Sequence, residues 1–86
     1  MAKKLTLTIV VNGQPTSLEA NEEEPLGALI PRALEQTGNT GQPPDQWELR
    51  DAAGEVLDPR RKVESYGFAP GTTLFLNLRA GIGGHR

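Results

Sequence analysis

The first part of the chain alternates between apolar and polar side chains. Every second residue from 5 to 11 is a large aliphatic one, namely Leu5, Leu7, Ile9 and Val11. A period of two that is rich in β-branched residues predicts a half-buried strand. The dipeptide Asn12-Gly13 follows directly and favours a two-residue hairpin turn. We therefore expect residues 15–20 to form the antiparallel partner strand, with Leu18 directed inward.

The pattern then changes to apolar residues at three- and four-residue spacing: Leu26, Leu29, Ile30, Ala33, Leu34 and Thr37. This spacing predicts an amphipathic helix. Pro25 and the acidic residues 22–24 suit its start, and Gly38 suits its end. Pro31 is unfavourable inside a helix because it removes a backbone donor. Either the helix kinks there or its regular part begins near Ile30, and the pattern leaves both possibilities open.

Three further strands are predicted in the second half of the chain. Residues 46–51 alternate again and direct Trp47 and Leu49 inward, and Val56-Leu57 is expected to form a short strand. The last predicted strand covers residues 73–79. Leu74, Leu76 and Leu78 face inward in this strand, whereas Phe75 and Asn77 face outward.

The segment before the last strand carries three predicted core residues under a loop or a short helical turn: Val63, Tyr66 and Phe68. The hydroxyl of a buried tyrosine needs a partner, so we expect that of Tyr66 to bond to a backbone group of a loop. The nearby basic cluster, residues 60–62, is interpreted as a solvated turn rather than an anion site.

The predicted order is strand, strand, helix, strand, short strand, strand. The first and last strands are both strongly apolar on one face, so we expect them to lie side by side. This is an α+β fold of the β-grasp (ubiquitin-like) type, a mixed sheet of four to five strands with one helix across one face. Residues 1–79 form the domain. Residues 80–86 contain three glycines and are expected to form a flexible C-terminal tail.

Composition argues against several classes of function. The chain has 86 residues, and 9 Lys plus Arg against 11 Asp plus Glu give a net charge of -2, which argues against a nucleic-acid binder. It has no cysteine, so disulfides, thiolate metal sites and a cysteine nucleophile are excluded. The single histidine is His85. No apolar run is long enough for a membrane span or a secretory signal. We expect a cytoplasmic protein that is not an enzyme, has no cofactor or metal, and contacts neither nucleic acid nor membrane.

The carboxyl-terminal half contains several motifs in a fixed order: Pro43-Pro44-Asp45-Gln46, Trp47-Glu48-Leu49-Arg50, Gly54, Leu57, Tyr66, Thr73-Leu74-Phe75-Leu76, Leu78-Arg79 and Gly83-Gly84. With one insertion near residues 52–53 and one in the tail, this order resembles ubiquitin and the ubiquitin-like modifiers. The chain is most similar to the bacterial ubiquitin-like proteins found beside activating-enzyme-like, conjugating-enzyme-like and JAB-type zinc peptidase partners.

The resemblance implies a protein modifier. In such a protein the carboxylate of the terminal glycine is adenylated, passed to an enzyme cysteine and transferred to an amine of a target protein. Glycine suits this role because it threads a narrow tunnel and adopts dihedrals barred to other residues. The matching positions here are Gly83 and Gly84, and Arg79, Gly81 and Ile82 are expected to contact enzyme partners. The resemblance suggests that the modifier takes part in bacterial antiviral defence.

The chain departs from the family pattern in two places. It ends in His85-Arg86, so a modifier role requires a peptidase, of the JAB type by resemblance, to remove this dipeptide after Gly84. The positions that match the apolar recognition patch of ubiquitin are Arg50 and Asn77. Both are polar, so we expect them to bind readers specific to this system rather than readers of ubiquitin.

Two alternatives stay open. In a sulfur carrier, the Gly84 carboxylate becomes a thiocarboxylate for cofactor synthesis; carriers of this kind typically end at the glycine. In a non-conjugated β-grasp interaction domain, no free glycine is needed. The β-grasp fold alone does not distinguish these functions.

Overall fold

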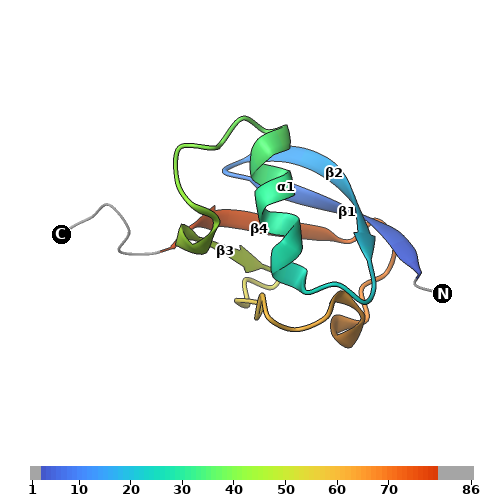
Figure 1. Cartoon of the computed structure of the whole chain (residues 1–86). Coiled ribbons are helices and arrows are strands. Elements are labelled where there is room, and N and C mark those ends of the chain that lie inside the picture. Colours follow the sequence, from blue (N-terminus) through green and yellow to red (C-terminus); the bar gives the residue numbers. More distant parts are fainter. Residues whose placement is uncertain (1–2, 80–86) are drawn as a thin grey trace.

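A four-stranded mixed sheet carries one helix across one of its faces (Figure 1). The computed structural model describes residues 3–79. The strands are β1 (Lys4–Val11), β2 (Gln14–Asn21), β3 (Trp47–Arg50) and β4 (Thr73–Leu78), in the order β2-β1-β4-β3. The helix is α1 (Leu29–Gln36), and three short 3₁₀ turns are η1 (Leu26–Ala28), η2 (Pro44–Gln46) and η3 (Val63–Tyr66). The predicted α+β, β-grasp fold is confirmed.

The first strand lies at the centre of this sheet. It pairs antiparallel with β2 through the predicted hairpin, in which Asn12 (φ 50°) and Gly13 (φ 89°) both adopt positive φ. This is the conformation that a two-residue turn of the primed type requires. On its other side β1 pairs in parallel with β4, from Thr8 against Thr73 to Val11 against Leu76. The expectation that the first and last strands lie side by side is therefore confirmed.

The position of Pro31 explains how a proline fits into this helix. The regular helix begins at Leu29, after the 3₁₀ turn η1, so Pro31 is its third residue. The first four backbone N–H groups of a helix have no intrahelical acceptor, and a proline there costs no hydrogen bond. Of the two possibilities left open by the sequence, the later start is the correct one. At the other end Gly38 (φ 75°) donates to the Glu35 carbonyl and Asn39 to the Leu34 carbonyl, which forms the glycine-terminated helix end that was predicted.

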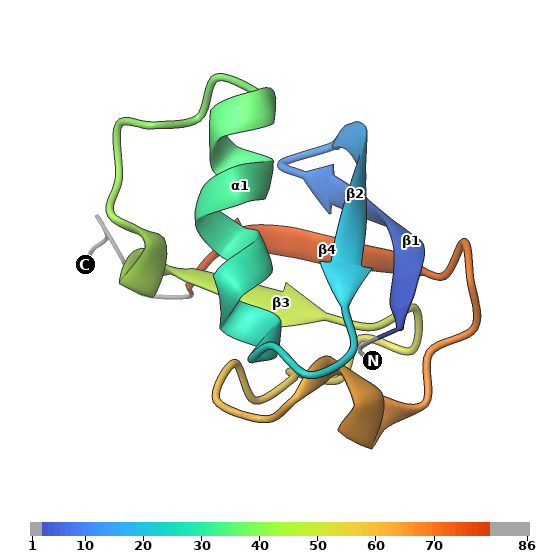
Figure 2. The ribbon, with the colours of Figure 1, turned by 45° about the vertical axis from the view of Figure 1, so that its right-hand side comes forward.

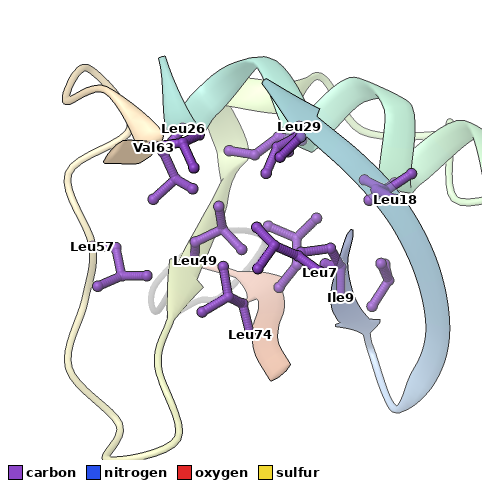
Figure 3. Close-up of a cluster of buried hydrophobic side chains, with 14 of the residues drawn as sticks. Leu7, Ile9, Leu18, Leu26, Leu29, Leu49, Leu57, Val63 and Leu74 are labelled. Atoms are coloured by element: carbon purple, nitrogen blue, oxygen red, sulfur yellow. The ribbon is translucent and has the colours of Figure 1, made fainter. Parts of the chain in front are cut away.

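The core fills the space between α1 and the sheet (Figure 3). Leu7, Ile9 and Val11 of β1 are fully buried, as are Leu74 and Leu76 of β4. Within residues 3–79, no polar or charged residue is buried. From the helix side the contributing residues are Leu26, Leu29, Ile30, Ala33 and Leu34, and the remaining members are Leu5, Leu18, Ala20, Trp47, Leu49, Leu57 and Val63.

Two details of the predicted sheet are wrong. Val56-Leu57 is not a strand: Val56 makes a single bridge to Arg50 and is 55% exposed, while Leu57 alone reaches the core. Leu78 is 42% exposed rather than inward-facing in the core. It lies beyond the end of β1, since Val11 pairs with Leu76, so the sheet has only β3 and β4 at that point.

The segment before β4 packs against the core and is bonded to the loop that precedes it. Val63 is buried, whereas Tyr66 and Phe68 are partly buried, with stacked rings 5.3 Å apart. The Asp58 backbone N–H donates to the Tyr66 hydroxyl at 2.7 Å, so the predicted link between this hydroxyl and a loop is confirmed. The same loop is joined to η1, because the Gly27 N–H donates to the Pro59 carbonyl at 2.8 Å.

The close approach of Gly27 to Pro59 predicts a stability effect. A Cβ at position 27 would lie 2.9 Å from the Pro59 Cβ and 3.0 Å from its carbonyl oxygen. Gly27→Ala therefore forces the loop away from the helix start, and we expect a loss of about 1–3 kcal/mol in the free energy of unfolding. Denaturant unfolding followed by the fluorescence of Trp47, the single tryptophan, measures this loss.

Gly41→Ala is the matched control. A Cβ at position 41 meets no atom within 4 Å. We expect this substitution to change the free energy of unfolding by less than about 0.5 kcal/mol. Equal stabilities of the two variants would contradict the role assigned to the contact between Gly27 and Pro59.

Candidate functional site

The end of β4 is fastened to the turn that precedes β3. The Arg79 backbone N–H donates to the Gln46 carbonyl at 2.9 Å, and its side-chain Nε donates to the Asp45 carbonyl at 2.8 Å. These two bonds fix the point and direction at which the chain leaves the sheet. The predicted conjugation, processing and tail residues lie outside the described part of the chain: Gly81, Ile82, Gly83, Gly84, His85 and Arg86.

Two hollows flank this exit point and share Trp47 as a wall. One has a volume of about 260 Å³ and is lined by Ile30, Pro59 and Arg79 among others. The second, of about 280 Å³, includes the exposed Leu78. The indole is 4% exposed, and its Nε1 has no hydrogen-bond partner in the described residues. The exit point is thus bordered by a mainly apolar hollow on one side and by a hollow of mixed polarity on the other.

The sequence did not indicate that Asp45 and Gln46 accept hydrogen bonds from Arg79. Their motif, Pro43-Pro44-Asp45-Gln46, contributed to the resemblance, but both act here through backbone carbonyls. A carbonyl carries no residue-specific signal, so only the pairing of β3 with β4 reveals its partner. Arg79 itself was predicted as a contact residue, and the structure places it at the exit point.

The predicted partner-binding residues Arg50 and Asn77 lie on the sheet face opposite α1. They occupy neighbouring strands, where Asn77 pairs with Glu48 and Arg50 pairs with Phe75. Nε and Nη2 of Arg50 both donate to Glu48 Oε2, at 2.9 and 2.6 Å, and Nη1 donates to the Gly54 carbonyl. The guanidinium is therefore held flat along β3 and its charge is paired. The sequence did not reveal this pairing.

An apolar row crosses the same face and includes residues that the sequence analysis did not assign as binding residues. The strand register aligns Pro15, Val10, Phe75 and Arg50, and the bridge to Arg50 adds Val56 at the end. Val10 and Phe75 are half-buried, and the other apolar members are exposed. The apolar part of this face thus lies over the two central strands, with the paired Arg50 beside it. Only the outward direction of Phe75 had indicated it.

The basic turn at residues 60–62 is engaged with its own loop. The Arg60 backbone N–H donates to Asp58 Oδ1 at 2.9 Å, and this bond lowers the pKa of the Asp58 carboxyl below its ordinary value, with the Arg60 side chain adding to the effect. Arg61 lies over the Tyr66 ring, 4.5 Å from its centre. The turn therefore organises the loop rather than forming an open cluster of cations.

The described residues form neither a metal-binding group nor a membrane-spanning helix. In residues 3–79 no group of histidine, cysteine, aspartate or glutamate side chains is arranged to hold a metal ion. No helix in the same range has the length and apolar character needed to cross a membrane.

The polar pair at Arg50 and Asn77 predicts how this face treats readers of ubiquitin. Such readers depend on an apolar hot spot at these positions, and a charged, internally paired arginine does not provide one. We expect no binding of a ubiquitin-reader domain to the wild-type chain in an NMR titration. Making both positions apolar with Arg50→Ile and Asn77→Val should produce measurable binding, whereas Glu23→Gln, at an exposed position, should not. Binding of the unaltered chain at the β3–β4 face would contradict this reading.

Solved structures place the fold among ubiquitin-like proteins. A protein designed de novo on the basis of ubiquitin matches with a TM-score of 0.75 and 30% identity, covering 96% of this chain and 95% of that one. The ubiquitin of Caldiarchaeum subterraneum matches with a TM-score of 0.73 and 26% identity, covering 91% of this chain and 96% of that one. The fold is ubiquitin-like.

Sequence comparison adds a relative and a family. The uncharacterized protein y4jI of Sinorhizobium fredii (strain NBRC 101917 / NGR234) is 48% identical over 81 residues, which are 94% of this chain and 62% of that protein. The chain thus spans less than two thirds of the relative's length. The model of the family described as "Protein of Unknown function (DUF2604)" matches residues 1–84, and the chain therefore belongs to this family.

Proposed function

We propose that the protein is the precursor of a ubiquitin-like protein modifier that is processed after Gly84 and attached to amines of target proteins. The observation that carries the proposal is the end of β4 on a ubiquitin-like fold. There Arg79, held by Asp45 and Gln46, leads into a segment that contains Gly83-Gly84. The protein supplies no catalytic group in this scheme; it supplies a carboxylate and a surface that enzymes recognise.

The proposed reaction has four steps: hydrolysis, adenylation, thioester formation and amide formation. A peptidase adds water across the peptide bond between Gly84 and His85, which leaves the Gly84 carboxylate and a free His-Arg dipeptide. An activating enzyme then joins this carboxylate to the AMP of ATP and releases pyrophosphate. An enzyme thiolate displaces AMP to form a thioester, and a target amine displaces the thiol to form an amide. The partners are a JAB-type zinc peptidase, an activating-enzyme-like protein and a conjugating-enzyme-like protein.

The geometry at the exit point suits these enzymes. Gly84 is the fifth residue after Arg79, which corresponds to a reach of at most about 18 Å. Within residues 3–79 the Arg79 side chain donates through Nε alone, to the Asp45 carbonyl. Its terminal nitrogens can therefore donate to carboxylates of an activating enzyme while the guanidinium stays in place. The hollows beside Trp47 and Leu78 offer further contact area.

The resemblance also supports a setting for the reaction. ATP-dependent activation fits a cytoplasmic protein, and bacterial antiviral defence is the process we propose. Lys3, Lys4 and Lys62 are exposed, and they are the three lysines of the chain at which a second modifier could be attached.

Intact mass spectrometry tests the processing step. The chain is co-expressed with the proposed JAB-type peptidase, and we expect a product shorter by His85-Arg86 alone. Gly84→Asp should block this cleavage, because the added side chain opposes entry into a narrow active site. Ala69→Asp, which adds the same side chain at an exposed position before β4, is the control and should be cleaved like the wild type. An unchanged mass with a peptidase that is active on another substrate would contradict the proposal.

Tryptic mass spectrometry tests the conjugation step separately. A chain that ends at Gly84 bypasses the peptidase and is expressed with the activating and conjugating enzymes. Trypsin cleaves after Arg79, so a modified lysine should carry the remnant Ala80-Gly81-Ile82-Gly83-Gly84. A mass increase equal to the exchange of one oxygen for sulfur, without adducts, would identify a sulfur carrier instead. Full activity in cells after deletion of residues 83–86 would identify a non-conjugated domain.

A further inference from the structure

The outer edge of β2 has its own pattern of backbone hydrogen-bonding groups. This strand lies at the end of the sheet order, next to β1 alone (Figure 2). The Thr8 N–H donates to the Thr72 carbonyl, and the Thr6 carbonyl accepts from Gly71, so both threonines direct their backbone groups toward the β4 side. Their partners on β2 are Ser17 and Glu19. In an antiparallel ladder, the groups of such partners point away from the strand pair.

The same alternation makes Pro15, Ser17, Glu19 and Asn21 the residues whose backbone groups face the free edge. Two independent contacts confirm this direction. The Asn21 N–H donates to Glu24 Oε2 at 2.8 Å, and the Glu19 carbonyl accepts from Arg32 Nη2 at 2.7 Å. Neither bond could form if these groups pointed into the β1–β2 ladder.

Several edge groups are satisfied within the chain. Besides its N–H, the Asn21 carbonyl is occupied, since it accepts from the Glu24 N–H at 3.1 Å. Arg32, which also lies 3.5 Å from Glu24, occupies the Glu19 carbonyl. Pro15 has no N–H to present. Four groups remain along the edge: the Pro15 carbonyl, the Ser17 N–H and carbonyl, and the Glu19 N–H.

We propose that two copies of this chain pair through these four groups, with their β2 strands antiparallel about a twofold axis at Ser17. In this register Ser17 faces Ser17 of the second copy, and each donates its N–H to the carbonyl of the other. Pro15 faces Glu19 of the second copy, so each Glu19 N–H reaches a Pro15 carbonyl. The two sheets join into one sheet of eight strands.

The register leaves no edge group of residues 15–19 without a partner. In an ordinary antiparallel pair, the Glu19 carbonyl would accept from the residue opposite. That residue is Pro15 of the second copy, which has no N–H, and Arg32 of the same chain provides the missing donor. An axis at Thr16 would set Ser17 opposite Pro15 and leave the Ser17 carbonyl without a donor. An axis at Leu18 would set Pro15 opposite Asn21, whose N–H is already bonded to Glu24. Moving the axis by two residues would set Pro15 opposite Pro15 or Glu19 opposite Glu19, which leaves groups unpaired or opposes two carboxylates. The complementarity therefore specifies a second copy of this chain and one register.

The side chains at this edge suit the pairing. Ser17 is small and exposed, so two serines can meet on the face opposite α1. The Glu19 carboxylate lies 3.9 Å from Lys4 Nζ, so its negative charge has a cation nearby. On the helix side, the Thr16 hydroxyl donates to Gln36 Oε1 at 2.6 Å and does not use an edge group. The interface is short, so the dimer should be weak and dependent on concentration.

Sedimentation velocity on the 86-residue chain, from about 10 µM to about 1 mM, tests the dimer. We expect the sedimentation coefficient to rise with concentration from that of a monomer. Amide hydrogen exchange over the same range gives the site-specific readout on the unaltered chain: the Ser17 and Glu19 amides should become more protected as the dimer forms. A monomer at all concentrations would overturn the proposal, and so would a dimer in which these two amides exchange unchanged.

A pair of substitutions at one position separates backbone pairing from side-chain contact. Ser17→Pro removes an N–H that faces the edge and takes no part in the β1–β2 ladder, so the fold should survive. We expect its dimer dissociation constant to rise at least about tenfold. Ser17→Ala keeps the N–H and should stay within about twofold of the wild type. Trp47 fluorescence and thermal unfolding verify that both variants are folded. If Ser17→Pro does not fold, amide exchange on the unaltered chain decides whether the dimer forms.

Discussion

The parallel pairing of β1 with β4 is the constraint on which the rest of the molecule depends. It brings residues 8–11 against residues 73–76, near opposite ends of the chain. Two parallel strands cannot be joined by a tight turn, so a long connection must cross a face of the sheet. In this chain the connection contains η1, α1 and β3, and α1 covers the apolar side chains of both central strands. The fully buried aliphatic residues of β1 and β4 are the consequence.

The same pairing determines where functional groups can lie. Because β1 ends at Val11, opposite Leu76, the last residues of β4 extend past the sheet centre and keep β3 as their one neighbour. Leu78 is exposed for this reason, and within residues 3–79 Arg79 bonds to the carbonyls of Asp45 and Gln46. The chain therefore leaves the fold at a fixed point. A modifier needs such a point, since its carboxyl-terminal residues must enter an enzyme while the domain stays folded.

The sequence predicted those features that depend on local periodicity. Alternation identified β1, and Asn12-Gly13 identified the hairpin, because the turn requires positive φ at both positions. It failed where the result depends on strand register. Val56 has an apolar neighbour and strand-like composition, yet it makes one bridge only. The bond of Arg50 to Glu48 joins side chains two positions apart on one strand face, and the sequence shows both residues without showing that they are paired.

The candidate site also contains some features that the sequence indicates and others that only the structure reveals. Gly83-Gly84 and Arg79 are recognisable because the proposed modifier chemistry depends on those residue types. The carbonyls that hold Arg79 are not recognisable, since any residue has a carbonyl. The apolar row across the outer face also required the structure, because Val10, Phe75 and Pro15 come from three strands whose alignment follows from two separate pairings. The apolar surface is formed around Val10 and Phe75. The positions that match ubiquitin's apolar patch, Arg50 and Asn77, are polar.

The proposed self-association at β2 and the proposed conjugation at the end of β4 would use different parts of the sheet. β1 and β4 separate the β2 edge from β3, so a partner copy paired at Ser17 would lie on the side away from Arg79. The two hollows at Trp47 would also remain open, because neither is lined by β2. An enzyme acting on the tail therefore has access to each member of a dimer. Since a twofold axis presents two tails per assembly, pairing would raise the local concentration of conjugation sites without altering the contacts at either one.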